Sequence, residues 1–395
     1  MPRSCLHIFL SNIENETRLY KEAAFVLSND IADKVTVLGL WADHLPEQET
    51  TEYGLEIHRK RTWIRRYRDS ALLQRVSLLR KLIAVLSLLQ YAVSSIRTAR
   101  RHRPTHVCCH NALMLPVAWA MARLSGATLE YLPHELETQR SGLSGLKKKI
   151  ETWVERRFIH SARNVVVVCD PIRDWYYDAY GLKNLHVVRN VPEREAVTVH
   201  PVPEGDFRAR FAIPSKATLF IYQGLFGPGR GTDMLLDVFS RLDPAKSHLV
   251  LMGYGDPHSQ VIIDKAVQDH ENIHYQPAVD REWIVSYSAG ADIGVSINNG
   301  NSLSYRYSLP NKFFEYSHAG LALVVSDNMT FQADLITDKN LGRVTAFEKS
   351  YECFKALSEM DLSPFRRQTL DYAKEAVWEH DAQAFAEVYR ATERN

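Results

Sequence analysis

Residues 308–315 read Ser-Leu-Pro-Asn-Lys-Phe-Phe-Glu, which places a cation and a carboxylate on one short segment. Pro310 predicts the start of a helix here, because its missing N–H would have no partner in a first helical turn. The free N–H groups and positive dipole of that turn, together with Lys312, favour binding of a phosphate group. Glu315 follows Lys312 by about one turn, so it can reach a ribose hydroxyl. The segment therefore predicts a nucleotide site.

A second candidate site is the glycine-rich segment 223–231, which reads Gln-Gly-Leu-Phe-Gly-Pro-Gly-Arg-Gly. It follows a predicted strand and precedes a predicted helix. Glycines accept positive φ and let a ligand approach the backbone. The guanidinium of Arg230 can bind a diphosphate through two parallel hydrogen bonds. Taken alone, the motif is a weak signal, since a tight strand–helix turn without a ligand is the alternative; together with residues 308–315 it favours a ligand site.

The elements that would position these residues follow from alternating apolar runs and helical patterns. Strands are expected at 6–10, 34–39, 106–109, 128–132, 164–169, 218–223, 248–252, 273–276, 293–296 and 321–325. Helices are expected at 17–28, 70–100, 113–124, 146–162, 232–241, 260–269, 283–289, 311–317 and 364–391. Gly320 is expected as the left-handed C-cap of the helix at 311–317. This alternation predicts parallel, doubly wound sheets, which bind ligands at the carboxyl ends of their strands.

The length of 395 residues indicates two domains. Pro201, Pro203 and Gly205 mark a linker, taken as 196–215, between an N-terminal domain at 1–195 and a second domain at 216–374. Hydrophobic residues make up 45% and charged residues 24%, which is typical of a soluble globular protein. The formal net charge is only +1, and no nucleic-acid-binding module is recognisable, so a nucleic acid partner is not expected.

The five cysteines are scattered and lack the Cys-x-x-Cys spacing of a zinc site. This pattern favours a reduced, cytoplasmic protein. The apolar run 6–10 has no cleavage-site pattern after it, so a first strand fits it better than a signal peptide.

Residues 59–103 form a strongly basic segment, with 13 Lys and Arg residues against one acidic residue, Asp69. Its uncharged run 82–96 is shorter than the roughly 20 residues that span a membrane. Across the basic segment, residues recur at helical spacing to form a largely apolar stripe: Leu72, Leu73, Val76, Leu79, Ile83, Leu86 and Leu89 or Gln90. A basic amphipathic helix on an anionic membrane surface would have this pattern. A helix packed on its own domain with a solvated basic face is the alternative.

Residues 304–327 resemble the donor-sugar site of family-4 retaining glycosyltransferases, in the bacterial branch that builds surface polysaccharides. The shared signature is Ser-Leu-Pro-Asn-Lys, then Glu-Tyr, then Gly before a strand that ends in Ser-Asp. The resemblance covers nearly the whole chain and is strongest over 130–192 and 218–330. It implies the GT-B fold, which is α/β with two doubly wound Rossmann-like domains facing a cleft. It also implies that a C-terminal helix, about 375–395, crosses back to the first domain.

The resemblance assigns roles to residues of the second domain. The catalytic group would contain Arg230, Lys312 and Glu315, with Glu315 on the nucleotide ribose. The donor-binding group would contain Gly224, Gly229, Gly231, Gly253, Tyr254, Val279, Tyr307, Ser308 and Asn311. Two positions depart from the family pattern: Leu225 replaces a frequent arginine, and Tyr307 replaces the first glutamate of a pair. Tyr307, Ser308 or a backbone amide would then contact the donor sugar.

In the N-terminal domain, His134-Glu135-Leu136 resembles the family motif Asp-x-His-Glu-Leu. This match gives His134 a catalytic or donor-sugar role, with a purely structural histidine as the alternative. Residues expected on the acceptor side are Asn12, Arg18, His110, Glu135 and Glu137; for His110, structure and function are equally supported. No Asp-x-Asp motif occurs. Charge stabilisation by Arg230, Lys312 and a helix N-terminus is therefore expected in place of a metal, with no cofactor.

The expected activity is transfer of a sugar from a nucleotide-diphosphate sugar to a glycan acceptor with retention. The resemblance and the basic segment together favour a polyprenyl-linked acceptor at the inner face of the plasma membrane, in O-antigen, capsule or exopolysaccharide synthesis. Two alternatives stay open. One is a nucleotide-sugar epimerase, which shares the two-domain fold. The other is a non-catalytic subunit that binds a partner transferase, which the loss of a carboxylate at Tyr307 would permit.

Overall fold

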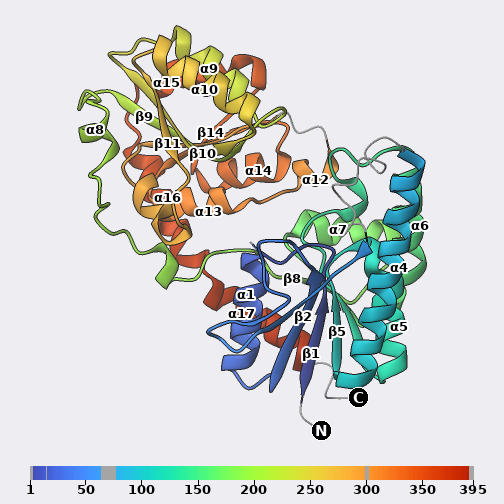
Figure 1. The fold of residues 1–395 in the computed structure, drawn as a ribbon. Helices are drawn as coiled ribbons and strands as arrows, with labels where there is room; N and C mark the ends of the chain where they lie inside the picture. Colours follow the sequence, from blue (N-terminus) through green and yellow to red (C-terminus); the bar gives the residue numbers. More distant parts are fainter. Residues whose placement is uncertain (1–2, 15, 64–76, 299–301, 391–395) are drawn as a thin grey trace. The chain divides into compact units, whose positions relative to one another are not determined.

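The computed structural model describes residues 3–14, 16–63, 77–298 and 302–390 (Figure 1). Leu72, Leu73 and Val76 of the predicted apolar stripe, and the start of the predicted helix at 70–100, lie outside these ranges. The chain divides into two compact units. Unit 1 consists of Met1–Arg189 and Ala382–Asn395, and unit 2 consists of Asn190–Asp381.

Unit 1 contains an eight-stranded sheet in the order β3-β4-β2-β1-β5-β6-β7-β8. Its strands are β1 (Ser4–Ile8), β2 (Lys34–Leu40), β3 (Gln48–Thr50), β4 (Glu56–Lys60), β5 (His106–Cys109), β6 (Thr128–Tyr131), β7 (Asn164–Val167) and β8 (Leu185–Val187). All described pairings are parallel except that of β3 with β4. The strand order reverses between β1 and β5, so this is a doubly wound sheet with its switch point there.

The helices of unit 1 are α1 (Thr17–Ser28), α4 (Ser77–His102), α5 (Leu115–Ser125), α6 (Gly145–Phe158) and α7 (Asp170–Tyr180). The last helix, α17 (Trp378–Arg390), also packs here: the side-chain amide of Asn164 donates to the Val388 carbonyl at 3.2 Å. The 3-10 turns among the described residues are η1 (Ala112–Met114), η2 (Glu137–Gln139), η3 (Ile159–Ser161), η4 (Glu195–Val197), η5 (Arg281–Trp283) and η6 (Phe347–Lys349).

Unit 2 contains a six-stranded, fully parallel sheet in the order β11-β10-β9-β12-β13-β14. Its strands are β9 (Thr218–Phe226), β10 (Ser247–Gly255), β11 (Ile273–Pro277), β12 (Ile293–Ser296), β13 (Ala322–Ser326) and β14 (Gly342–Thr345). Its helices are α8 (Phe207–Arg210), α9 (Thr232–Arg241), α10 (Pro257–Asp269), α11 (Ile284–Ser288), α12 (Leu303–Arg306), α13 (Asn311–His318), α14 (Thr330–Lys339), α15 (Ser350–Leu357) and α16 (Ser363–Glu375). Counted within the unit, the order is 3-2-1-4-5-6, which is the Rossmann order with its switch point between β9 and β12.

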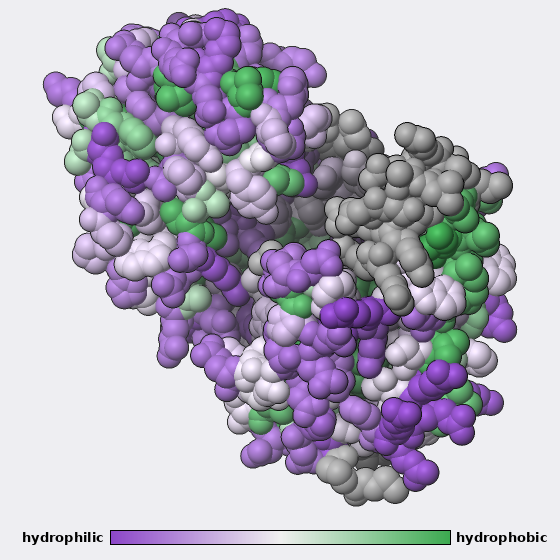
Figure 2. Space-filling view, in the orientation of Figure 1, coloured by the Kyte–Doolittle hydropathy of each residue, from purple (hydrophilic) through white to green (hydrophobic). Residues whose placement is uncertain are grey.

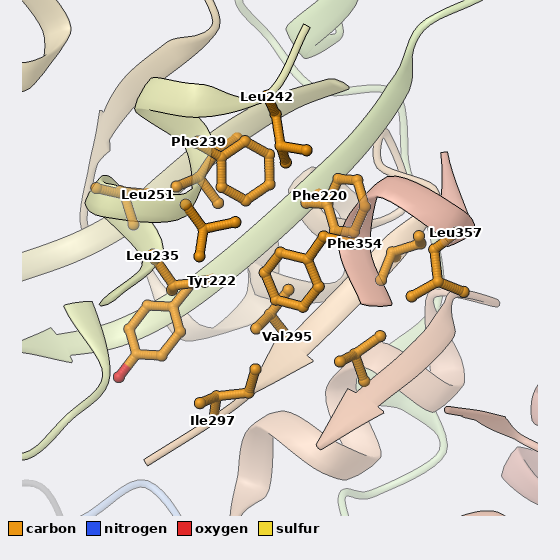
Figure 3. Packing of buried hydrophobic residues seen from close by; sticks show 14 of the residues in the cluster. Phe220, Tyr222, Leu235, Phe239, Leu242, Leu251, Val295, Ile297, Phe354 and Leu357 are labelled. Atoms are coloured by element: carbon orange, nitrogen blue, oxygen red, sulfur yellow. The ribbon is translucent and has the colours of Figure 1, made fainter. Parts of the chain in front are cut away.

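Aromatic packing holds one face of this sheet (Figure 3). The rings of Phe220, Phe239 and Phe354 are fully buried, and their centroids lie 5.2–5.8 Å apart. These residues come from β9, α9 and α15, so the strand and the helices on this face share one core. A buried Phe typically contributes about 1.5–3 kcal/mol through removal of its surface from water.

The predicted single helix at 364–391 is wrong, because α16 ends at Glu375 and α17 begins at Trp378. Backbone groups at the break bond to other elements. The Ala376 carbonyl accepts from the ring of His318 at 2.9 Å, and the Trp378 amide donates to the Pro192 carbonyl at 2.8 Å. The predicted linker also contains structure, since Phe207 of α8 is buried beside Tyr287.

Candidate active site

A cavity of about 360 Å³ lies in unit 2 at the carboxyl ends of β9 and β10. It lies beside the switch point of the sheet, where Rossmann-type folds bind their ligands. Its size falls within the range of about 300–1,000 Å³ for small-molecule sites. It is lined by Tyr222, Gln223, Gly224, Leu225, Arg230, Met252, Gly253, Tyr254, Ala278, Val279, Ile284, Pro310, Asn311, Lys312 and Glu315.

Two glycines bring neighbouring strands close together beneath this cavity. Gly224 and Gly253 are register partners on β9 and β10, with φ of 121° and 150°. A Cβ on Gly253 would lie 1.9 Å from the Gly224 carbonyl oxygen, so a side chain cannot be placed there without moving the backbone. Gly229 and Gly231 also have positive φ, but they shape the turn into α9 and do not line the cavity.

Lys312 lies in the first turn of α13 and lines the cavity. Its Nζ is 3.9 Å from the centroid of the Tyr222 ring, a cation–π contact. Burial and then the nearby Arg230 lower the pKa of Lys312 to about 7. An anionic group in the cavity would oppose both effects. Pro310 is the residue before the helix and not its first residue, because its ψ of 158° is extended.

Glu315 lies one turn further along α13 and faces the same cavity. Burial raises its pKa to about 7, although Arg281 and Lys312 oppose that rise. The side-chain amide of Gln223 donates to Glu315 Oε2, while Gln223 Oε1 accepts from Ser288 Oγ at 2.9 Å. Gln223, in the carboxyl-terminal half of β9, therefore fixes the position of the Glu315 carboxylate.

Sequence reasoning gave no role to Tyr222 or to the side chain of Gln223. Their position in the sequence could have indicated them, since they are the last two residues of a predicted strand, just before the glycine-rich turn. Of the predicted donor group, Gly224, Gly253, Tyr254, Val279 and Asn311 line the cavity together with Arg230, Lys312 and Glu315. Tyr307 and Ser308 do not: Tyr307 closes α12, and the Ser308 hydroxyl donates to the Tyr305 carbonyl at 2.8 Å.

His134 belongs to unit 1, where it follows β6. Its Nε2 lies 3.1 Å from Nδ1 of His110. Burial and then the positive charge of Arg18 lower the pKa of His134 to about 3, so the ring is neutral at physiological pH. His110 is itself buried, and its Nε2 lies 2.9 Å from Nδ1 of His7.

The remaining acceptor-side residues take different positions. Asn12 bonds through its side-chain amide to Glu14 at 2.9 Å. Arg18 is only 3% exposed; its Nε donates to Glu22 at 2.6 Å, and its two terminal nitrogens have no hydrogen-bond partner in the described chain. Glu135 is half-buried beside His134 in the sequence.

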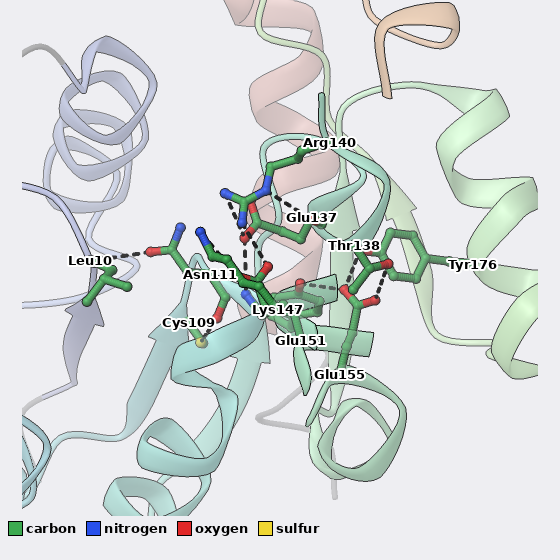
Figure 4. A network of polar contacts seen from close by, with 12 residues as sticks. Leu10, Cys109, Asn111, Glu137, Thr138, Arg140, Lys147, Glu151, Glu155 and Tyr176 are labelled. Atoms are coloured by element: carbon green, nitrogen blue, oxygen red, sulfur yellow. Dashed lines mark hydrogen bonds and ion pairs between the residues drawn. The ribbon is translucent and has the colours of Figure 1, made fainter. Parts of the chain in front are cut away.

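Buried carboxylates secure the loop that carries His134 (Figure 4). Glu137 accepts from the Ala112 amide at 3.2 Å, and burial raises its pKa to about 7. Arg140 donates to the Glu137 carbonyl at 2.8 Å and to Glu151 at 2.8 Å. Glu155 accepts hydroxyl hydrogen bonds from Tyr131, Tyr176, Tyr180 and Thr138. Glu137, a predicted acceptor ligand, is therefore a support of its own loop.

Within the described residues, no group of three His, Cys, Asp or Glu side chains is arranged to hold a metal ion.

Comparisons with known proteins bear on both units. Residues 25–191 match the family described as "Glycosyl transferase 4-like domain". No curated protein matches the sequence significantly.

Solved structures match almost the entire chain. Sucrose-phosphate synthase from Thermosynechococcus elongatus superposes with a TM-score of 0.72 at 13% identity, over 99% of each chain. HepE from Anabaena, solved with UDP-glucose, gives 0.72 at 12% identity, over 98% of this chain and 99% of that one. WaaG, a glycosyltransferase of lipopolysaccharide biosynthesis, gives 0.66 at 13% identity, over 98% and 99%. Residues 25–191 thus match a glycosyl transferase 4-like domain, and the chain as a whole has the GT-B fold.

Proposed function

We propose that this protein is a retaining glycosyltransferase that moves a sugar from a nucleotide-diphosphate sugar to a glycan acceptor. The observation that carries the proposal is the cavity of unit 2, where Arg230, Lys312 and Glu315 converge at the switch point of a Rossmann sheet. Two cations suit a diphosphate and a carboxylate suits ribose hydroxyls. Crystals of HepE with UDP-glucose show that a protein of similar fold takes such a donor.

In this proposal the bond between the anomeric carbon and the diphosphate oxygen breaks, and the nucleoside diphosphate leaves. Arg230, Lys312 and the N–H groups at the start of α13 stabilise the negative charge that develops on the leaving oxygen. The acceptor oxygen bonds to the anomeric carbon from the same face, and its proton passes to the departing phosphate oxygen. Retention is what the family resemblance implies. The side chains supply positive charge without a metal or cofactor.

We propose further that the acceptor is polyprenyl-linked and that the protein works on the cytoplasmic face of the plasma membrane, in surface polysaccharide synthesis. Helix α4 supports membrane contact, because apolar side chains point outward and small or polar side chains point toward unit 1, the reverse of a usual surface helix. The face that packs on unit 1 is small or polar: Ser87, Tyr91, Ser95, Thr98 and Ala99 are buried. The outward face is apolar, and Leu82, Val85, Leu86, Leu89 and Val93 are exposed (Figure 2).

Basic side chains border this apolar face. A groove of about 610 Å³ is lined by Leu86, Leu89 and Val93 together with Lys60, Arg97 and Arg101. This pairing of apolar surface and cations matches the boundary between lipid headgroups and acyl chains. By length and composition alone, Leu79–His102 is also long enough to cross a membrane. Its polar buried face and its packing on α5 favour contact with the membrane surface.

The test is turnover of UDP-, GDP- and dTDP-sugars with and without a membrane extract as acceptor. The proposal expects release of one nucleoside diphosphate only with acceptor, and a product that keeps the anomeric configuration. Conversion of the nucleotide sugar without acceptor, seen by NMR, would identify an epimerase. Diphosphate binding without any turnover would identify a non-catalytic subunit.

A further inference from the structure

Three histidines form a continuous row in unit 1, on strands that neighbour one another in the sheet. His7 lies near the end of β1, His110 directly follows β5, and His134 follows β6. Nδ1 of His7 lies 2.9 Å from Nε2 of His110, and Nδ1 of His110 lies 3.1 Å from Nε2 of His134. Phe9 stacks on His110 with a centroid distance of 3.8 Å, which fixes the plane of the central ring.

The two hydrogen bonds couple the tautomers of all three rings. A neutral imidazole carries one N–H and one lone pair, so each bond between rings needs one donor and one acceptor. If His134 is protonated on Nε2, then His110 accepts on Nδ1 and must itself be protonated on Nε2, as must His7. The other solution has all three rings protonated on Nδ1. Mixed tautomers would break at least one of the two bonds.

The surroundings keep the row neutral. Burial is the main cause that lowers the pKa of each ring, to about 3 for His7 and His134 and well below the ordinary value for His110. Arg18 on α1 adds positive charge beside His110 and His134, and His106 on β5 adds to the effect on His7. The Leu132 carbonyl acts in the opposite direction on His110 alone.

We propose that His7 and His110 are positioning residues for His134. Through the two hydrogen bonds, the row of three rings sets both the orientation and the tautomer of the His134 ring that meets the sugar substrate. Nδ1 of the half-buried His134 makes no hydrogen bond within the described chain, so it is the atom left for a ligand. This inference rests on the proposed function and on the donor-sugar role that the family resemblance gives to His134. The coupling of tautomers, by contrast, is a property of the protein without substrate.

The coupling is tested on the whole protein with ¹⁵N-labelled histidine. Long-range ¹H–¹⁵N spectra distinguish the two tautomers and the protonated ring, and single substitutions assign the signals. The expected result is one tautomer shared by His7, His110 and His134, neutral at least down to pH 5. Different tautomers in the three rings, or protonation of any of them near pH 6.5, would overturn the inference whether or not the protein transfers sugar.

The positioning role is tested by His110→Asn and His110→Phe. The asparagine amide can still bond to His134 from the place of Nδ1, whereas phenylalanine keeps the stacking on Phe9 but removes the bond. We expect His110→Phe to lower kcat at least about tenfold, the scale of a lost orienting partner, with the Kd for nucleoside diphosphate unchanged. His110→Asn should recover most of that loss. Equal loss in both variants would contradict the positioning role.

The chain offers a matched control in unit 2. His248 and His274 also share a buried bond between rings, at 2.9 Å, but they lie at the amino ends of β10 and β11, away from the cavity. His248→Phe should leave kcat unchanged, and thermal unfolding checks that all variants fold. If wild type binds diphosphate yet transfers no sugar, the proposed function fails while the NMR result still decides the coupling.

Discussion

At the scale of single residues, Lys312 and Glu315 carry the strongest chemical signal. Both face one cavity, and both have pKa values displaced to about 7 by burial, one downward and one upward. Perturbed pairs of this kind gather at functional sites. A pKa of about 7 leaves Lys312 partly neutral near pH 7, and we expect it to gain a proton when an anion binds.

Binding of a nucleoside diphosphate at pH 8 should therefore take up a proton. The pKa of Lys312 is about 7 without ligand, so the amine is mostly neutral at pH 8, and the diphosphate charge raises that pKa. Calorimetry in buffers of different ionisation enthalpy measures the uptake, and affinity should fall as pH rises above 7. Lys312→Met should abolish the uptake. Equal uptake in that variant would assign the proton to another group.

Arg230 should act on phosphate alone. It lies exposed in the turn before α9 and lines the cavity. Arg230→Ala should weaken diphosphate binding about tenfold, the scale of a lost charge-assisted hydrogen bond, and leave binding of the free nucleoside unchanged. Arg241, at the other end of α9 and paired with Asp237, gives the matched control Arg241→Ala. A similar loss for the nucleoside would show that Arg230 shapes the pocket instead.

At the scale of elements, Tyr316 fixes α13 against the sheet. Its hydroxyl oxygen accepts a hydrogen bond from the backbone N–H of Gln223 at 2.8 Å and donates to the Val295 carbonyl at 3.4 Å. Tyr316→Phe leaves the buried Gln223 N–H without its acceptor, which costs about 1–3 kcal/mol of unfolding free energy. Because Gln223 also holds Glu315, diphosphate affinity should fall too. Chemical denaturation and calorimetry measure the two effects, with the exposed Tyr177→Phe as control. If Tyr316→Phe lowers the free energy of unfolding but keeps full diphosphate affinity, Gln223 has no role in binding the ligand.

Elements with strong local signals were predictable from the sequence. The apolar run before Ser326 became β13, and Gly320 ends α13 with φ of 70°, as expected of a left-handed cap. β3, β4, β8 and β14 were missed because each has only three to five residues and none contains a run of buried apolar side chains. The break at Ala376 was unpredictable, because its carbonyl is satisfied by His318 from a distant helix.

The same distinction applies to the site. Lys312 and Glu315 were predictable because Glu315 follows Lys312 by three positions, about one turn of the same helix. Tyr222 and Gln223 gain their roles only when folding brings α13 against β9, some 90 residues away in sequence. The family pattern alone predicts Tyr307 as a donor contact, and Tyr307 does not line the cavity.

At the scale of the whole molecule, the outward face of α4 makes a prediction about location. The protein should sediment with vesicles containing phosphatidylglycerol and less with phosphatidylcholine alone. Replacing Leu86 and Leu89 with Glu should weaken binding more than about tenfold, since each buried Leu contributes about 1.5–3 kcal/mol. The control is Val261→Glu, which changes an exposed apolar residue on α10 of unit 2. If the double variant binds the vesicles as well as wild type does, the outward face of α4 is not the membrane-binding surface.

Calorimetry with UDP, GDP, dTDP and CDP, on wild type and Glu315→Ala, tests the central claim most directly. One diphosphate is expected to bind wild type tightly, and the variant is expected to lose that binding, because Glu315 lines the cavity beside Lys312. Absence of binding by all four, or equal binding by the variant, would contradict the assignment of this cavity to a nucleotide-sugar donor.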